Sequence, residues 1–197
     1  SLDLADQGSI FFNGQNYANL TEDQLADMRK DQMGFVFQEA TLLKNLNILD
    51  NILLPHQLRT NHSPQSLESN ARDLMEQLGI GGLENRGIQE VSGGQLQRAG
   101  ICRAILHEPQ ILFADEPTGA LNSQSGMEVM DIFQTLHQEG MAILMVTHDP
   151  KIAAYSDKIL LMRDGKIIET LAYKSQEIQD HASKVKALSQ SLLNLGI

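Results

Sequence analysis

Short apolar runs alternate with segments of helical character along the second half of the chain, and this alternation constrains the fold more than any other feature. The runs at 110–114, 142–147 and 158–163 are predicted as strands, with helical segments between them. Strands that alternate with helices indicate a mostly parallel sheet with helices on its faces. We therefore predict an α/β fold. Because ligands of such sheets bind at the carboxyl ends of the strands, we expect the functional site there.

The remaining elements of the second half follow from the same patterns. The sequence predicts helices at 92–106 and 123–138 and a short helix before the strand at 158–163. The tripeptide "RDG" at 163–165 predicts a turn into a last strand at 166–170. The core of the fold is thus expected to extend to about Thr170.

The N-terminal part of the chain predicts a small β portion followed by a helical insertion. "GSIFFNG" is a strand that ends in an Asn-Gly turn, which is a strong hairpin signal. Thr21 and Gln24 have the spacing of a helix capping box, and "MGFVFQ" is predicted as a buried strand that ends at Gln38. The segment 39–91 is helical and polar, so we predict a helical subdomain inserted into the α/β core.

Length and composition limit the possible classes of protein. The 197 residues, of which 42% are hydrophobic, are enough for a single domain over 1–197 with its own core. The net charge of −10 argues against a nucleic-acid partner, which normally requires a basic surface. The single cysteine, Cys102, excludes an internal disulfide and fits a reducing compartment. No apolar run approaches the roughly 20 residues that span a bilayer, and no signal-peptide pattern is present.

Two carboxylates follow the strand of "ILFADEP". Asp115 and Glu116 would repel each other at the strand end unless a cation or a proton intervened. One interpretation assigns Asp115 to Mg²⁺ and makes Glu116 the general base for an attacking water. The other is a strand-end turn closed by Pro117, with both acids in solvent. Taken alone, the motif leaves these two interpretations open.

His148 and Gln38 each follow a different predicted strand. A neutral imidazole just beyond "MVT" can bind a γ-phosphate or hold a water, although an ordinary loop histidine fits the pattern as well. A glutamine amide at the end of "GFVFQ" can offer its oxygen to Mg²⁺, or it can simply be a polar residue leaving a strand. Neither residue decides the function without the others.

The stretch "VSGGQ" opens a predicted helix with two poor helix formers. Ser92 and Gln95 fit a plain capping box, which needs no ligand. Gly93 and Gly94 each cost about 1 kcal/mol relative to alanine inside a helix, so the capping box leaves them unexplained. The exposed amides of a helix N-terminus bind anions, and glycine allows a close approach to the backbone. We therefore favour a phosphate site here over a purely structural cap.

The order of these motifs resembles that of the ATP-binding subunit of ABC transporters. "VSGGQ" is similar to the family signature LSGGQ, and "ILFADEP" resembles the Walker B strand followed by the catalytic glutamate. Gln38 resembles the Q-loop glutamine and His148 the switch histidine. "GALN", which ends at Asn122, resembles the D-loop, usually SALD. "GFVFQEATLL", "NILLP" and "ADEPTGAL" are similar to the branch that handles lipoproteins, macrolides and antimicrobial peptides.

The resemblance implies a P-loop NTPase-like fold that binds ATP and Mg²⁺. It implies that Glu116 is the catalytic base and that His148 senses the γ-phosphate. Asp115 and Gln38 would be the Mg²⁺ ligands. The nucleotide held by a second subunit would be contacted by Ser92, Gly93, Gly94, Gln95 and Asn122.

The sequence departs from the family pattern in two ways. No GxxxxGK[ST] phosphate loop is present, and the only Gly-Lys pair, at 165–166, lies in a predicted turn. We therefore expect a subunit truncated just after Walker A, inactive alone and able to supply half of each ATP site; a naturally degenerate subunit is the alternative. A strand near the middle of the sheet would then be missing, which exposes unpaired backbone and apolar faces. Asn122 replaces the usual aspartate and so keeps a hydrogen-bond acceptor but not the charge.

The first functional hypothesis is an ATPase subunit that drives export through a membrane permease and dimerises with a second ATP-binding subunit. Such a subunit would lie at the cytoplasmic face of the membrane. The alternative is a non-hydrolysing subunit that docks on a permease or an intact partner. A soluble ABC ATPase of DNA repair or translation is disfavoured by the acidic charge and the short insertion.

The segment 171–197 extends beyond the core. Ile178, Val185 and Leu192 recur every seven residues, which predicts an amphipathic helix. Packing on its own domain is favoured over a coiled coil or a permease contact.

Overall fold

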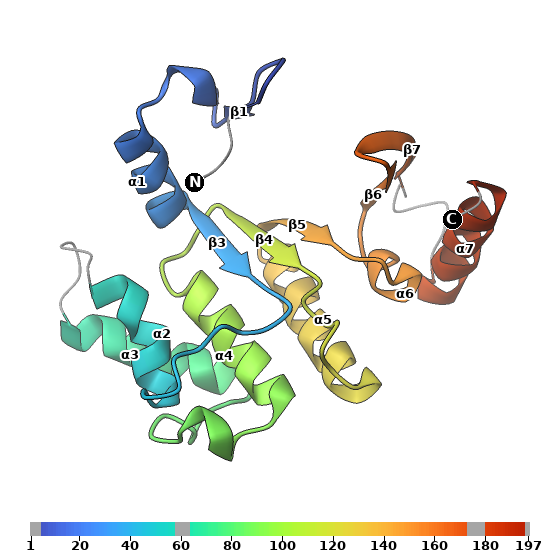
Figure 1. Ribbon diagram of the computed structural model, residues 1–197. Helices are drawn as coiled ribbons and strands as arrows, with labels where there is room; N and C mark the ends of the chain where they lie inside the picture. Colours follow the sequence, from blue (N-terminus) through green and yellow to red (C-terminus); the bar gives the residue numbers. More distant parts are fainter. Residues whose placement is uncertain (1–4, 58–63, 173–179, 196–197) are drawn as a thin grey trace.

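The computed structural model describes most of the chain, namely residues 5–57, 64–172 and 180–195. Its centre is a parallel sheet in the order β3-β4-β5, formed by Met33–Val36, Ile111–Asp115 and Ala142–Val146 (Figure 1). All three strands run in the same direction, in a register that places Phe35 beside Phe113 and Phe113 beside Leu144. The predicted α/β class with a parallel sheet is confirmed.

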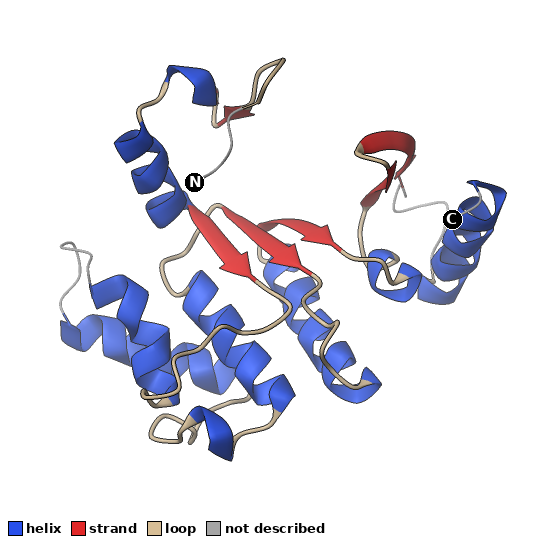
Figure 2. Ribbon diagram, viewed as in Figure 1, coloured by secondary structure: helices blue, strands red, loops and turns tan. Residues whose placement is uncertain are grey.

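Two helices cover one face of this sheet, α4 (Gly93–Ile105) and α5 (Ser123–Gln138) (Figure 2). Alternate strand residues such as Leu112, with 0% exposure, join the main core between sheet and helices. Strand β3 lies so close to α4 that a Cβ on Gly34 would fall 2.5 Å from the carbonyl oxygen of Ala104. This side of the sheet is therefore tightly packed.

The opposite face of the sheet carries exposed apolar side chains. Phe35 stacks on Phe113 with ring centroids 5.4 Å apart. On β5, Leu144 is 50% exposed and Val146 is 59% exposed. β5 pairs only with β4 among the described strands. Over the described residues, the sheet face opposite α4 and α5 is thus apolar and open.

Helices α2 (Ile48–Gln57) and α3 (Pro64–Gln77) fall within the predicted helical subdomain and pack beside α4. Side chains at helical spacing on α3 face the core, with Ala71 0% exposed and Leu78, just beyond the helix, 7% exposed. Gly79, at a left-handed φ of 67°, follows directly, a conformation that suits glycine at a helix end. A short 3₁₀ turn, η2 (Ile88–Glu90), precedes α4.

The N-terminal part forms the predicted hairpin and helix. β1 (Phe11–Phe12) and β2 (Gln15–Asn16) pair antiparallel through a turn in which Asn13 and Gly14 both have positive φ. After a 3₁₀ turn, η1 (Tyr17–Asn19), the helix α1 (Glu22–Gln32) begins with the capping box predicted for Thr21. Strand β3 ends at Val36, earlier than the predicted end at Gln38, because its pairing with β4 stops there.

The C-terminal part contains α6 (Pro150–Ala153), the antiparallel hairpin of β6 (Lys158–Arg163) and β7 (Lys166–Ala172), and α7 (His181–Leu195). Leu188 of α7, with 1% exposure, packs with Ile159 and Leu161 of β6. The Arg163 guanidinium also donates to the carbonyl oxygen of Leu195 over 2.9 Å. Helix α7 thus packs on the β6–β7 hairpin of the same chain; Ile178 lies outside the described residues.

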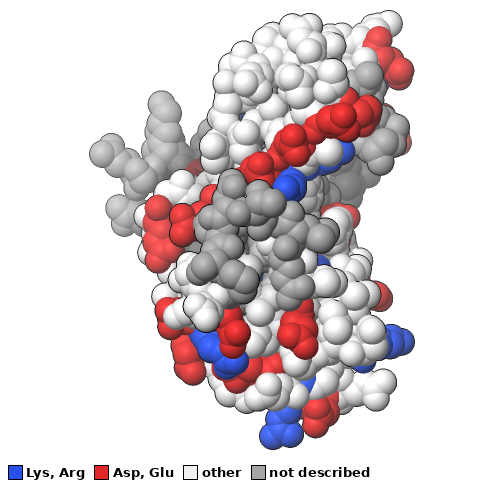
Figure 3. Space-filling model, turned by 90° about the vertical axis from the view of Figure 1, so that its left-hand side faces the viewer, with Lys and Arg blue, Asp and Glu red and all other residues white. Residues whose placement is uncertain are grey.

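Acidic side chains clearly outnumber basic ones on the face shown in Figure 3, in agreement with the net charge of −10. No described helix combines the length and the apolar character needed to cross a bilayer.

Candidate active site at the carboxyl ends of the strands

The two acidic candidates lie where β4 ends. Asp115 is the last residue of the strand and is exposed. Glu116 adopts a left-handed conformation with φ 45°, which is uncommon for a residue with a side chain. Its N–H still donates to the carbonyl oxygen of Val146 over 2.9 Å, so pairing with β5 continues across this residue. Strain of this kind is often found at functional sites, where neighbouring contacts maintain it.

The Glu116 carboxylate binds the segment that follows β5. Its Oε1 lies 2.6 Å from Nδ1 of His148 and accepts the backbone N–H of the same residue over 2.8 Å. Its Oε2 accepts the hydroxyl of Thr147 over 3.2 Å. The structure therefore brings together the two residues that the sequence predicts as catalytic. Thr147 was missed, although a hydroxyl residue beside His148 at a strand end was the available signal.

This contact changes the acid–base character of His148. The pKa of His148 is raised above its ordinary value, first by its hydrogen bond to Glu116 and then by the negative charge of that carboxylate. The side chain of His148 is 85% exposed, whereas the side chain of Glu116 is 20% exposed. Because Nδ1 faces Glu116, the other ring nitrogen remains available to donate to an anion.

Gln38 lies just beyond the end of β3, and its side chain reaches the loop after Glu116. A Cβ built on Gly119 would fall 2.9 Å from Nε2 of Gln38, so the glycine leaves room for the amide. Gln38 and Asp115 are both exposed and carry the oxygen atoms that Mg²⁺ prefers. The described residues contain no group of three or more His, Cys, Asp or Glu that could hold a metal. An amide oxygen and a carboxylate suit a Mg²⁺ ion that also binds nucleotide phosphates, which is its usual mode of binding.

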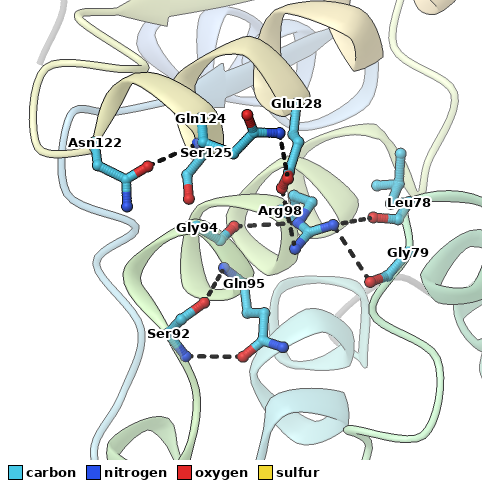
Figure 4. Close-up of polar contacts among 10 residues, drawn as sticks. All are labelled: Leu78, Gly79, Ser92, Gly94, Gln95, Arg98, Asn122, Gln124, Ser125 and Glu128. Carbon is cyan, nitrogen blue, oxygen red and sulfur yellow. Dashed lines mark hydrogen bonds and ion pairs between the residues drawn. The ribbon is translucent and has the colours of Figure 1, made fainter.

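The predicted phosphate site lies at the start of α4 and forms a complete capping box (Figure 4). The Ser92 N–H donates to the Gln95 side chain over 2.8 Å, and the Gln95 N–H donates to Ser92 Oγ over 3.3 Å. The two glycines differ in their surroundings. A Cβ on Gly94 would fall 2.9 Å from the Cβ and Oγ of Ser125, whereas one on Gly93 would meet nothing closer than Leu121 at 3.7 Å.

Helix packing therefore requires a glycine at 94, because α5 occupies the space that a side chain would need. The protein makes no such demand at Gly93, which is exposed, so its glycine leaves backbone open to a ligand. The two glycines thus have different explanations: packing against α5 for Gly94 and an open backbone for Gly93. The sequence suggested only the second.

Asn122 caps the neighbouring helix α5 by accepting the Ser125 N–H over 2.9 Å. The close approach of Gly94 to Ser125 places the N-termini of α4 and α5 side by side (Figure 4). Both helix dipoles present their positive ends there, which favours a bound anion. An asparagine suffices for the cap, so the missing negative charge does not disturb this helix.

Arg98 joins the first turns of α4 to two other elements and was missed by the sequence reasoning. Its Nη1 lies 3.4 Å from the carbonyl oxygen of Gly79, and its Nη2 lies 3.7 Å from a carboxylate oxygen of Glu128 (Figure 4). The first contact reaches the end of α3 and the second reaches α5. Arg98 therefore links the helical insertion, the start of α4 and the core.

The sequence of this chain matches the model of a known protein family. The family model described as "ABC transporter" matches residues 2–119, a span that contains Gln38, the Ser92–Gln95 stretch, Asp115 and Glu116. The chain belongs to the ABC transporter family.

Curated ABC relatives cover most of this chain. The macrolide export ATP-binding/permease protein MacB of Mannheimia succiniciproducens is 41% identical over 187 residues, which is 94% of this chain and 29% of MacB. The ABC transporter ATP-binding protein YxdL of Bacillus subtilis is 40% identical over 180 residues, 91% of this chain and 69% of YxdL. The chain thus spans less than a third of the length of MacB.

A solved structure supports the ABC fold as well. The dimeric, post-hydrolysis ATP-binding cassette MJ0796, bound to ADP and Pi, superposes with a TM-score of 0.77 at 30% sequence identity. The match covers 88% of this chain and 76% of that one. The predicted P-loop NTPase-like fold is confirmed.

Proposed function

We propose that this chain is the ATP-binding and ATP-hydrolysing cassette of an ABC exporter. The observation that carries the proposal is the contact between Glu116 and His148 at the ends of β4 and β5, beside Asp115. This contact joins Glu116, the candidate base, to His148, whose ring can donate a hydrogen bond to a phosphate. The names of the MacB and YxdL relatives and the nucleotide bound to MJ0796 support the same activity.

In this proposal Glu116 accepts a proton from the water that attacks the γ-phosphate of ATP. His148 orients that phosphate through the ring nitrogen that faces away from Glu116. Asp115 and Gln38 would hold Mg²⁺ together with the phosphates. The bound ion supplies neutralisation of the negative charge that develops on the phosphate oxygens.

The start of α4 would contact the γ-phosphate of ATP held by a second ATP-binding subunit. Ser92 and Gly93 are exposed and lie at paired helix N-termini, which suits an anion arriving from outside the chain. The capping side chains of Gln95 and Asn122 and the buried Gly94 would shape that surface. The dimeric MJ0796 cassette supports this arrangement.

Coupling to transport would require a membrane permease, with this chain held at the cytoplasmic face of the membrane. The MacB relatives, named ATP-binding/permease proteins for macrolide export, support both the permease and the direction of transport. The proposal includes no nucleic-acid partner, in line with the acidic surface.

The test is ATP turnover by the complete subunit, reconstituted with its permease, before and after Glu116→Gln. We expect at least a 100-fold loss of kcat with ATP binding retained, because the variant keeps the shape of the side chain and loses the base. Glu139→Gln, at the end of α5 and outside the site, is the control and should leave kcat unchanged. Unchanged turnover in Glu116→Gln would reject the assignment. A subunit that assembles with its permease and hydrolyses no ATP would favour the docking alternative.

A further inference from the structure

The segment 37–47, which joins β3 to α2 and carries Gln38, is described throughout and contains neither helix nor strand. Such a segment needs partners for its backbone polar groups wherever it is shielded from water. Here the partners are side chains that reach it from helices on both sides, α4 and α2. Its conformation is therefore set by tertiary contacts.

Three successive turns of α4 contact the beginning of this segment. Gln97 is 2% exposed, and its Nε2 donates to the carbonyl oxygen of Phe37 over 2.9 Å. One turn later, a Cβ on Gly100 would fall 3.2 Å from the Cβ of Ala40, so the two backbones approach closely. In the next turn, the Arg103 guanidinium donates to the carbonyl oxygens of Ala40 over 2.8 Å and Thr41 over 3.1 Å.

Asn51 of α2 holds the other end of the segment. Its side chain is 2% exposed, accepts the Leu43 N–H over 2.6 Å and donates to the carbonyl oxygen of Asn47 over 2.9 Å. Gln38 lies at the opposite end, directly after Phe37. Along the chain, the contacts from α4 are therefore nearer to Gln38 than those from Asn51.

The bond from Gln97 has a direct geometric effect on Gln38. The carbonyl of Phe37 and the nitrogen of Gln38 belong to one planar peptide unit, so holding that carbonyl orients the backbone from which the Gln38 side chain leaves. A buried amide that lost this partner would be costly, which keeps the bond formed. On the other side of Gln38, Gly119 leaves space for its amide.

Resting on the proposed function, we propose that Gln97 is the positioning residue for Gln38. Its buried hydrogen bond to Phe37, supported by Arg103, fixes the Gln38 amide at the Mg²⁺-nucleotide site from α4, the helix that Ser92 caps. The start of α4 and Gln38 are thereby held in one unit, although the two belong to different predicted motifs.

The first arm of the test measures hydrogen exchange in the peptide that covers 37–47. Gln97→Met keeps the side-chain volume and removes the donor, so we expect exchange there to rise about fivefold, as for the loss of one neutral hydrogen bond. The matched control is Gln134→Met on α5, which removes an equivalent bond, from Nε2 to the carbonyl oxygen of Tyr155 over 3.2 Å. The control should leave exchange in 37–47 unchanged.

The second arm is a double-mutant cycle on ATP turnover by the complete subunit with its permease. We expect Gln97→Met to lower kcat about fivefold and to leave the KM for ATP within about twofold. In a Gln38→Ala background the same substitution should have no further effect, since the residue that it positions is gone. A purely structural role would lower kcat by the same factor in both backgrounds.

The proposal would be overturned if Gln97→Met lowered kcat by the same factor in the wild-type and Gln38→Ala backgrounds. It would also be overturned if hydrogen exchange in 37–47 were unchanged in Gln97→Met. If Gln97→Met does not fold, Arg103→Lys, which loses the planar fork of donors, replaces it in both arms with the same expected results. A wild-type subunit without ATP turnover would instead refute the proposed function. The exchange arm would still decide whether Gln97 holds the segment that carries Gln38.

Discussion

The carboxylate of Glu116 and the imidazole of His148 meet over 2.6 Å across the ends of two neighbouring parallel strands. Two residues 32 positions apart in the sequence thus form one acid–base unit. The left-handed backbone of Glu116 turns its side chain toward β5, and the backbone N–H of His148 secures the same oxygen.

This unit predicts the pH behaviour of His148. We expect NMR titration to give His148 a pKa above about 6.5, the ordinary value, and Glu116→Gln to bring it back toward that value. Because the pKa is raised in the folded state, the stabilisation from the charged pair is full below about pH 6.5 and is lost as the pH rises through the folded pKa. Glu139→Gln, the control variant used above, should leave the His148 titration unchanged. A His148 titration unaffected by Glu116→Gln would contradict the pairing.

Alanine at 93 and at 94 should have different consequences. Gly94→Ala drives a methyl group into Ser125 and should lower the free energy of unfolding by about 1–3 kcal/mol. Gly93→Ala meets no such clash and should leave the free energy of unfolding unchanged or raise it by up to about 1 kcal/mol. Thermal denaturation of the two variants makes the comparison. Ser125→Gly should restore the stability of Gly94→Ala, and failure to do so would show that the clash lies elsewhere.

Removal of the Asn122 side chain should weaken the start of α5. Asn122→Ala loses the acceptor for the Ser125 N–H, and we expect a loss of about 1 kcal/mol in the free energy of unfolding. Asn122→Asp keeps an acceptor at the same place, so its stability should match that of the wild type. Urea denaturation of the three proteins checks the cap; equal stability of the alanine variant would contradict it.

The contacts of Arg98 differ in their expected contribution to the free energy of unfolding. The Arg98 bond to the carbonyl oxygen of Leu78 is part-buried. Glu128 is half-exposed at 3.7 Å, a distance and exposure at which an ion pair contributes little. We therefore expect Arg98→Met to lower the free energy of unfolding by about 1–2 kcal/mol and Glu128→Gln by less than about 0.5 kcal/mol. A larger effect of Glu128→Gln in chemical denaturation would reverse this ranking.

The sequence allowed the regular elements to be predicted well, because their signals are local. Helix α5 begins and ends at the predicted residues, 123 and 138. The capping boxes of Thr21 and Ser92 are present, and the turns at Asn13 and Asp164 have the left-handed backbone that Asn-Gly and Asp-Gly favour. Each of these depends only on residues a few positions apart.

Contacts between distant elements could not be predicted in the same way. The early end of β3 depends on where its pairing with β4 stops, and the hydrogen bond of Gln97 to Phe37 depends on how α4 lies against the sheet. Gln97 is a polar residue on a buried helix face. The sequence alone does not distinguish it from a polar residue on an exposed face. The candidate site was found by the order of its motifs, whereas the contact between Glu116 and His148 required the register of β4 and β5.

Gly94 and Ser125 share a single small volume between two helices, and this has an evolutionary consequence. Gly94 lies in the VSGGQ stretch and Ser125 lies in α5, beyond GALN, yet a larger side chain can be accepted at one of these positions only if the other stays minimal. In descendants of this sequence they should covary in size. Statistical covariation between 94 and 125 would then record steric exclusion between neighbouring helices, independently of any shared ligand.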